Sequence, residues 1–72
     1  MISFSSRLKE LRKNKGVTQK QVAEILEISE RNYRRYESGE IDPLTSNTIK
    51  LANYFNVSVD YLLGHTDNPV IH

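Results

Sequence analysis

The stretch that decides the fold is VTQKQVAEILEISERNYRRYESG, residues 17–39 of a 72-residue chain. Thr18 is a favourable helix N-cap, and Gln21 three residues later completes a Thr-x-x-Gln capping box. Ser29 is a second N-cap, and Gly39 is a residue type that commonly ends a helix. The stretch therefore predicts two short helices that are joined by a tight turn and pack at a steep angle.

The second of these helices is predicted over residues 30–38 and has two unlike faces. At about 100° per residue, Tyr33 and Tyr36 fall together on one side, which can be buried. The opposite side carries four charged residues over an arc of about 140°: Glu30, Arg31, Arg34 and Arg35. Arginine forks match O6 and N7 of guanine, and a carboxylate can accept from N4 of cytosine, so this face suits the major groove of B-DNA.

The same face has a simpler interpretation. A charged helix side is usually a solvated one, and Glu30 and Arg34 have the i,i+4 spacing of a surface ion pair. The helix alone does not separate this alternative from DNA binding, so the decision depends on the rest of the chain.

Short motifs follow one another along the whole chain. They are Arg7-Leu8-x-x-Leu11-Arg12, Gly16-x-Thr18-Gln19, Gln19-x-x-x-Ala23, Ile28-Ser29, Tyr36-Glu37-x-Gly39, Pro43, Leu51-Ala52 and Val57-Ser58-x-x-x-Leu62-Leu63. In this order and spacing the chain resembles the Cro/cI-type helix-turn-helix regulators, also called the xenobiotic-response-element family, which include the lambdoid phage repressors. The resemblance spans about residues 4–64. It implies an all-α fold, a compact five-helix lambda-repressor-like DNA-binding domain.

The chain departs from the family pattern in the turn and in the fourth helix. The family usually has glycine where Glu27 stands, and a positive φ at a non-glycine residue costs roughly 1 kcal/mol. Thr45 and Thr48 stand where the family prefers apolar residues. A positive φ at Glu27 would strain the turn, and the two threonines make the packing of the fourth helix harder to predict.

The resemblance implies that helix 30–38 reads DNA and that helix 19–26 positions it. The expected base contacts are Ser29, Glu30, Arg31 and Arg35, with Arg31 and Arg35 the strongest. The expected phosphate contacts are Gln19, Lys20, Asn32, Arg34 and Ser38. The resemblance also implies a structural salt bridge between Arg12 and Glu37, whereas Glu40 lowers the expectation of phosphate contacts from the loop after the helix.

The other three helices are predicted from capping and periodicity. The first covers residues 4–15, with Gly16 as its C-terminal cap. The fourth begins either after an Asp42 N-cap, with Pro43 in the first helical position, or after a Thr45 N-cap. The fifth follows a Ser58 cap and ends at Gly64, and it is expected to bury Val59, Leu62 and Leu63. Residues 1–64 form the predicted domain, and residues 65–72 form an irregular tail.

Composition excludes several classes of protein. The chain has no cysteine, which excludes a disulfide framework, and it has no apolar run near the ~18 residues that cross a bilayer. His65 and His72 are a poor metal site, and no catalytic constellation is present, so we expect neither an enzyme nor a cofactor nor a small-molecule ligand. Residues 1–40 carry a net charge of +3 and residues 41–72 one of −2, which suits a domain that presents one face to phosphates.

The sequence thus predicts a cytoplasmic, sequence-specific double-stranded DNA-binding transcriptional regulator of the repressor kind. A homodimer on a two-fold operator would place half-sites about 10–10.5 base pairs apart. The apolar candidates for a dimer interface outside the expected core are Ile49, Tyr54, Tyr61, Val70 and Ile71. The alternative is a protein-interaction module on the same fold, antitoxin or anti-repressor-like, since fold does not determine function.

Overall fold

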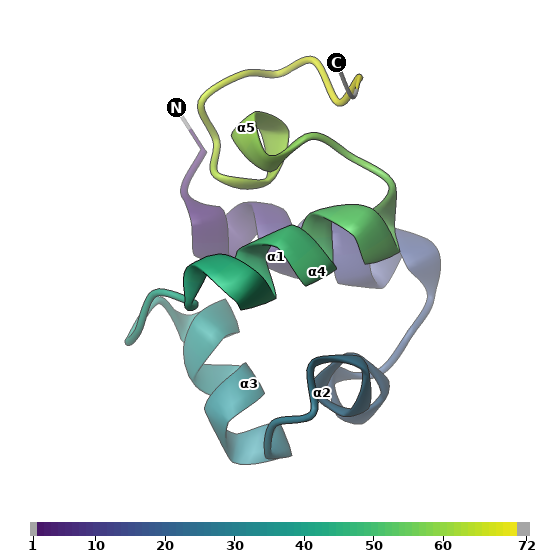
Figure 1. Ribbon diagram of the computed structural model, residues 1–72, viewed down its shortest axis with the longest axis vertical. Helices are drawn as coiled ribbons and strands as arrows, with labels where there is room; N and C mark the ends of the chain where they lie inside the picture. Colours follow the sequence, from purple (N-terminus) through teal and green to yellow (C-terminus); the bar gives the residue numbers. More distant parts are fainter. Residues whose placement is uncertain (1, 71–72) are drawn as a thin grey trace.

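A computed structural model describes residues 2–70, which form five α-helices and no strand (Figure 1). The helices are α1 (Phe4–Lys15), α2 (Gln19–Leu26), α3 (Glu30–Ser38), α4 (Thr45–Phe55) and α5 (Val59–Leu62). In Figure 1, α1 and α4 cross the middle of the molecule, α2 and α3 lie below them, and α5 lies above. The predicted all-α class is confirmed, and so are the predicted bounds of the first three helices.

Side-chain caps explain why α2 and α3 begin where they do. Thr18 Oγ1 accepts a hydrogen bond from the Gln21 amide, and Gln21 Oε1 accepts one from the Thr18 amide, at 3.1 and 2.8 Å. Ser29 Oγ accepts from the Asn32 amide at 3.1 Å. These bonds satisfy amides that have no partner inside the helix, and so the capping box and the Ser29 cap are both present as predicted.

The turn between α2 and α3 has the strained residue that the sequence indicates. Glu27 has φ 57°, in the left-handed region that favours glycine. Its amide donates to the Glu24 carbonyl, and the next amide, that of Ile28, donates to the Ala23 carbonyl, both at 3.1 Å. These bonds end α2 and offset the cost of the conformation, which is roughly 1 kcal/mol.

The core takes one large, fully buried side chain from each helix. These side chains are Leu8, Val22, Tyr33, Leu51 and Leu62. Burial of an apolar side chain of this size stabilises a fold by about 1.5–3 kcal/mol relative to its exposure. Because every helix contributes to the same cluster, α3 is held from behind by the whole domain.

The fourth helix begins at Thr45, near one of the two predicted starts, but neither predicted N-cap is correct. The N-cap is Leu44, which has an extended backbone and makes no side-chain cap bond, and Thr45 is already the first helical residue. The amide and the hydroxyl of Thr48 both donate to the Leu44 carbonyl, at 2.9 and 3.1 Å. This pair of bonds also shows how a threonine is tolerated at a buried position, since its hydroxyl has a partner.

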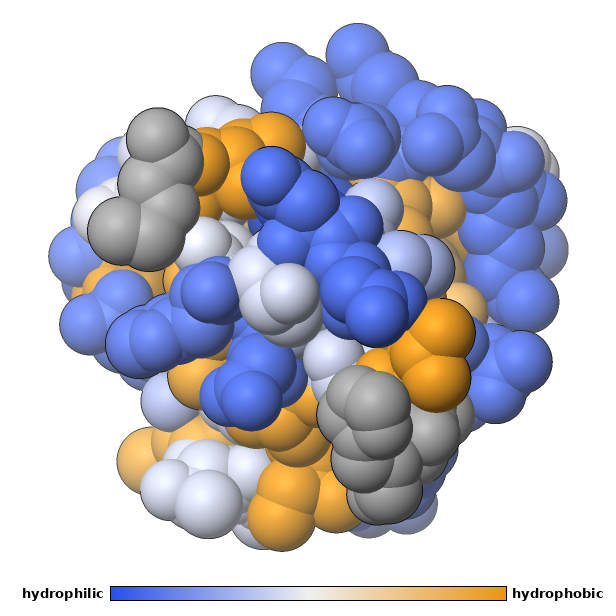
Figure 2. Space-filling view, turned by 90° about the horizontal axis from the view of Figure 1, so that it is seen from above, coloured by the Kyte–Doolittle hydropathy of each residue, from blue (hydrophilic) through white to orange (hydrophobic). Residues whose placement is uncertain are grey.

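The expected burial around α5 is only partly correct. Leu62 is fully buried, but Val59 and Leu63 are each 36% exposed. A helix of a single turn at the end of the molecule has the core on one side only, so its flanking apolar residues reach the surface. Figure 2 looks down on this end and shows hydrophobic surface among polar residues.

Two of the candidates for a dimer interface pack in part against the domain's own core. Tyr54 and Tyr61 are partly buried against the core. Lys15 Nζ lies 4.9 Å from the centre of the Tyr54 ring. Ile49 and Val70 are exposed, whereas Ile71 lies outside the described residues, as does His72.

Residues 65–70 are irregular, as predicted, but they contact the helices. The Ser58 amide donates to the Pro69 carbonyl at 3.1 Å. The buried Arg7 lies 3.7 Å over the Tyr61 ring, and its Nη2 pairs with Asp67 at 3.3 Å, while its Nε has no partner among residues 2–70. Arg7 therefore joins α1, α5 and the tail, a role that the sequence did not predict. Within residues 2–70, no helix has the length and apolar character to cross a bilayer.

Candidate nucleic-acid interface

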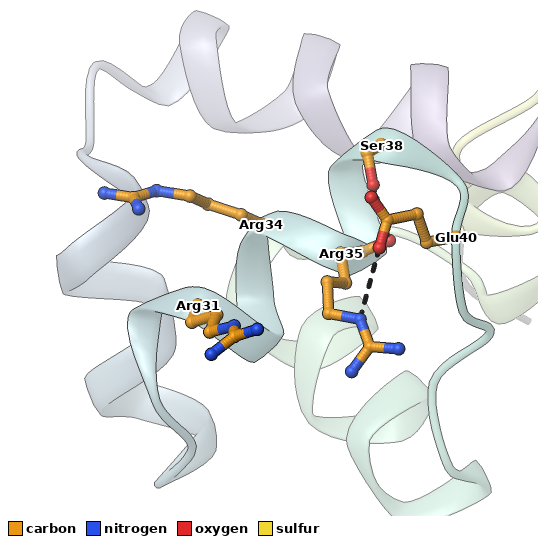
Figure 3. A pocket seen from close by; sticks show the side chains of 5 residues that line it. All are labelled: Arg31, Arg34, Arg35, Ser38 and Glu40. Atoms are coloured by element: carbon orange, nitrogen blue, oxygen red, sulfur yellow. Dashed lines mark hydrogen bonds and ion pairs between the residues drawn. The ribbon is translucent and has the colours of Figure 1, made fainter.

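The two faces of α3 differ as the periodicity predicts. Tyr33 and Tyr36 are buried, with their rings 6.3 Å apart in an edge-to-face arrangement. Figure 3 shows three arginine side chains that leave the other side of the helix: Arg31, Arg34 and Arg35. All three are exposed, and together with Ser38 and Glu40 they line an open hollow at the surface.

A largely buried ion pair holds the inner side of α3 against α1. Arg12 Nε donates to Glu37 Oε2 at 2.5 Å, and Arg12 Nη2 donates to Glu37 Oε1 at 3.3 Å. Tyr33 donates its hydroxyl to the same carboxylate, and Arg12 Nη1 donates to the Val17 carbonyl at 3.0 Å. The pair that the resemblance implies is therefore present, with hydrogen bonds that offset the cost of burying its charges.

The environment of this pair keeps both partners charged. Burial alone would raise the pKa of Glu37, but hydrogen bonds from Arg12, Tyr33 and Gln19 outweigh it and lower that pKa below its ordinary value. The hydrogen bond to Glu37 raises the pKa of Arg12 despite its burial. Burial and the neighbouring carboxylate raise the pKa of Tyr33, which therefore stays a hydrogen-bond donor.

Gln19 links the buried pair to the exposed face. Its Nε2 donates to Glu37 Oε1 at 3.3 Å, and its Oε1 accepts from Arg34 Nε at the same distance. Arg34 in turn donates from Nη2 to Glu30 Oε2 at 2.5 Å. Both ends of the Gln19 amide are thus in use, and Arg34 is held on two of its nitrogens. The sequence predicted the Glu30–Arg34 spacing but not the bridge through Gln19, which depends on where the N-terminus of α2 lies.

The end of α3 has a second exposed ion pair. Arg35 Nε donates to Glu40 Oε2 at 3.3 Å (Figure 3). Glu40 follows Gly39, whose φ of 82° turns the chain back beside the helix, and Ser38 Oγ donates to the Arg35 carbonyl at 3.2 Å. The sequence shows Glu40 where many family members have a cation, but it does not indicate the contact with Arg35.

The remaining predicted contacts are at the surface. Arg31 makes no ion pair within residues 2–70. Lys20 and Asn32 are exposed, and the exposed Ser29 uses an oxygen lone pair for its cap. The structure therefore brings the predicted base-contacting and phosphate-contacting residues to the α2–α3 side of the molecule. The three arginines of this side differ in the number of their side-chain partners.

A comparison with protein families matches residues 5–67 to one described as Helix-turn-helix domain. Among curated proteins, the chain is 49% identical over 63 residues to HTH-type transcriptional regulator ImmR of Bacillus subtilis (strain 168), which covers 88% of this chain and 50% of that protein. It is 38% identical over 63 residues to the cryptic phage CTXphi transcriptional repressor RstR of Vibrio cholerae serotype O1, covering 88% and 56%. The chain thus spans about half the length of these relatives.

Solved structures have the same fold. A transcriptional regulator from Listeria innocua superposes with a TM-score of 0.84 at 37% identity, over 90% of this chain and 63% of that one. The P22 c2 repressor, in a complex with synthetic operator 9T, also gives 0.84, at 23% identity over 92% of this chain and 100% of that one. The second likeness concerns the fold alone.

Proposed function

The chain belongs to the helix-turn-helix domain family, and we propose on this basis that it is a sequence-specific, double-stranded DNA-binding domain of a transcriptional regulator. The observation that supports this function best is the exposed arginine face of a helix that the core and the Arg12–Glu37 pair hold from behind. The proposed activity is binding rather than catalysis, in keeping with the names of the relatives.

In this proposal α3 enters the major groove. Arg31 and Arg35 are the principal base contacts, because a guanidinium can donate two hydrogen bonds to O6 and N7 of guanine. Ser29 and Glu30 complete the set at the start of the helix. Each good bidentate contact contributes about 1–3 kcal/mol of discrimination against the wrong base.

The proposed phosphate contacts surround this surface: Gln19, Lys20, Asn32, Arg34 and Ser38. Arg34 suits this role because Gln19 and Glu30 hold it toward α2, away from the middle of the exposed face. The first amides of α2 add to the site, since a helix N-terminus favours anions. Contacts of this kind set the orientation of a protein on DNA without reading its sequence.

A single short helix reads few base pairs, so we propose that a homodimer binds a two-fold operator in the cytoplasm and represses transcription. Ile49 and Val70 are the exposed apolar candidates for the interface among the described residues. The alternative, an antitoxin or anti-repressor-like protein-interaction module, is less well supported, because such a surface would be expected to present apolar side chains in place of the three arginines.

Selection from random duplex DNA, with the stoichiometry of the bound complex measured in the same samples, tests this function. We expect enrichment of a two-fold motif and binding that weakens steeply with salt. Arg31→Ala combined with Arg35→Ala should abolish the enrichment, whereas Lys50→Ala on the exposed side of α4 should preserve it. Folded wild-type protein that enriches no sequence in dilute buffer would overturn the proposal, and a monomer on every bound site would remove the dimer.

A further inference from the structure

The three arginines of the exposed face are held in three different ways. Arg34 is bound on two nitrogens, by Gln19 and by Glu30. Arg31 has no ion pair within the described part of the chain. Arg35 is bound on one nitrogen, Nε, by Glu40. Arg35 is thus held at Nε while both of its Nη nitrogens have no ion-pair partner among the described residues.

The nitrogen that Glu40 occupies determines what Arg35 can offer to a base. A guanidinium presents five N–H donors in a planar fork, and two neighbouring donors are enough for O6 and N7 of guanine. When Nε is taken by Glu40, the edge formed by Nη1 and Nη2 remains, at the far end of the side chain. Figure 3 shows this end directed away from Glu40.

We propose that Glu40 is a positioning residue that determines specificity, and that it does so by holding Arg35 with this terminal edge toward a guanine. The inference rests on the proposed DNA-binding function and deepens it, since it assigns a role to a residue outside the proposed base and phosphate contacts. Glu40 acts on base discrimination through Arg35 alone.

The exposure of the pair argues against a role in stability. The Arg35 side chain is 45% exposed and that of Glu40 is 63% exposed, and ion pairs in such surroundings contribute little to folding. A long arginine side chain loses much rotamer freedom when it binds, so a partner that holds it in advance favours the one base that fits this orientation.

The charge of Glu40 acts in the same direction. A carboxylate beside the interface repels phosphates and partly neutralises Arg35, which weakens attraction to DNA of any sequence. Glu40 should therefore lower non-specific affinity and raise the ratio of specific to non-specific binding. If Glu40 merely supported the fold, its replacement would change the non-specific affinity and the specificity ratio only when it also lowered the thermal stability.

The test compares four proteins with the wild type: Glu40→Gln, Arg35→Ala, the double variant, and Glu24→Gln as a control. Glu24→Gln removes the same charge from an exposed position of α2 that has no ion pair in residues 2–70. Each protein is titrated with the selected operator, with the operator changed at the base pair for which Arg35→Ala loses its preference, and with an unrelated duplex. Thermal melting is measured in parallel.

We expect Glu40→Gln to reduce discrimination at that base pair roughly two- to five-fold and to bind the unrelated duplex more tightly, with an unchanged melting temperature. In the Arg35→Ala background, Glu40→Gln should have no further effect on discrimination. Glu24→Gln should leave discrimination as it is in the wild type.

The inference would be overturned if Glu40→Gln discriminated between the base pairs as well as the wild type does. It would also be overturned if Glu40→Gln reduced discrimination by the same factor in the Arg35→Ala background. Both results would leave the proposed function intact. An equal loss in Glu24→Gln would also overturn it, because the effect would then belong to net charge. A wild-type chain that discriminates between no two duplexes would overturn the proposed function and this inference together.

Discussion

The inner side of α3 has one arginine–glutamate pair and the outer side has two, and the closest pairs of the two sides have the same length but different burial. Arg12–Glu37 on the inner side and Arg34–Glu30 on the outer side both have a closest contact of 2.5 Å. The inner side chains are 14% and 4% exposed, and the outer ones are 60% and 37% exposed. Burial, rather than distance, therefore separates a pair that anchors the helix from one that remains available to a ligand.

Glu37→Ala should have the largest effect, because it leaves Arg12 charged and poorly solvated with its main partner gone. We expect a loss of about 3–5 kcal/mol in the free energy of unfolding, measured by urea denaturation. A domain of this size has a total stability of roughly 4–11 kcal/mol, so the milder Glu37→Gln, which keeps the shape of the side chain, should be measured beside it. A midpoint equal to that of the wild type would show that the inner pair does not anchor α3.

Protonation of the same carboxylate should remove a smaller part of this stabilisation. The pKa of Glu37 is lower in the folded protein than its ordinary value of about 4.3, so its contribution is complete above that value and is lost as the pH falls below it. Carboxylates titrate between about pH 6 and pH 3, and over this range the free energy of unfolding should fall more in the wild type than in Glu37→Gln. Parallel curves for the two proteins would contradict a lowered pKa.

Arg35→Ala tests the outer side, where the effect should appear in recognition and not in folding. We expect a loss of about 1–3 kcal/mol of discrimination at one base position, with the melting temperature unchanged. Arg34→Ala is the matched control, and it should weaken binding to all sequences alike because the residue is proposed to meet phosphate. An equally uniform loss in Arg35→Ala would move that residue to the phosphate class.

Tyr33→Phe removes one hydrogen bond to the inner carboxylate and should cost about 1.5 kcal/mol of stability, because the acceptor is charged. Tyr36→Phe is the natural comparison: the Tyr36 hydroxyl accepts from Asn47 Nδ2 at 3.1 Å, which is a bond between neutral groups. Denaturant midpoints should therefore fall further in the first variant. Equal losses would show that the charge of Glu37 adds nothing to its bond with Tyr33.

Glu30→Gln should have the smallest effect. The outer pair is exposed, and i,i+4 pairs of this kind contribute less than about 0.5 kcal/mol to stability. Thermal melting at low salt should show at most a loss of stability of this size, and the loss should disappear at high salt. A loss comparable to that of Glu37→Ala would erase the distinction between the two sides of the helix.

Predictions from the sequence were correct where the signals are local. The caps at Thr18 and Ser29 and the glycines after α1 and α3 act on adjacent backbone groups, and the bounds of the first three helices follow from them. The N-cap of α4 was not predicted, because Asp42 and Thr45 are favourable cap residues and Leu44 is not.

The candidate site also has features that the sequence predicted and contacts that it did not. Helical periodicity separated the tyrosine side of α3 from its arginine side, and the resemblance supplied the pairing of Arg12 with Glu37. Neither indicated that Gln19 would bridge two ion pairs or that Glu40 would hold Arg35. These contacts depend on the path of the chain before α2 and after Gly39, which no spacing rule encodes.

The sequence by itself determined the helix-turn-helix and the two-sided character of its second helix, because capping and a 3.6-residue period act within a few residues. Only the tertiary structure decided which apolar side chains of α5 are buried and that Gln19 binds Arg34. Those outcomes are set by what lies across from each side chain, and that neighbour comes from another part of the folded chain.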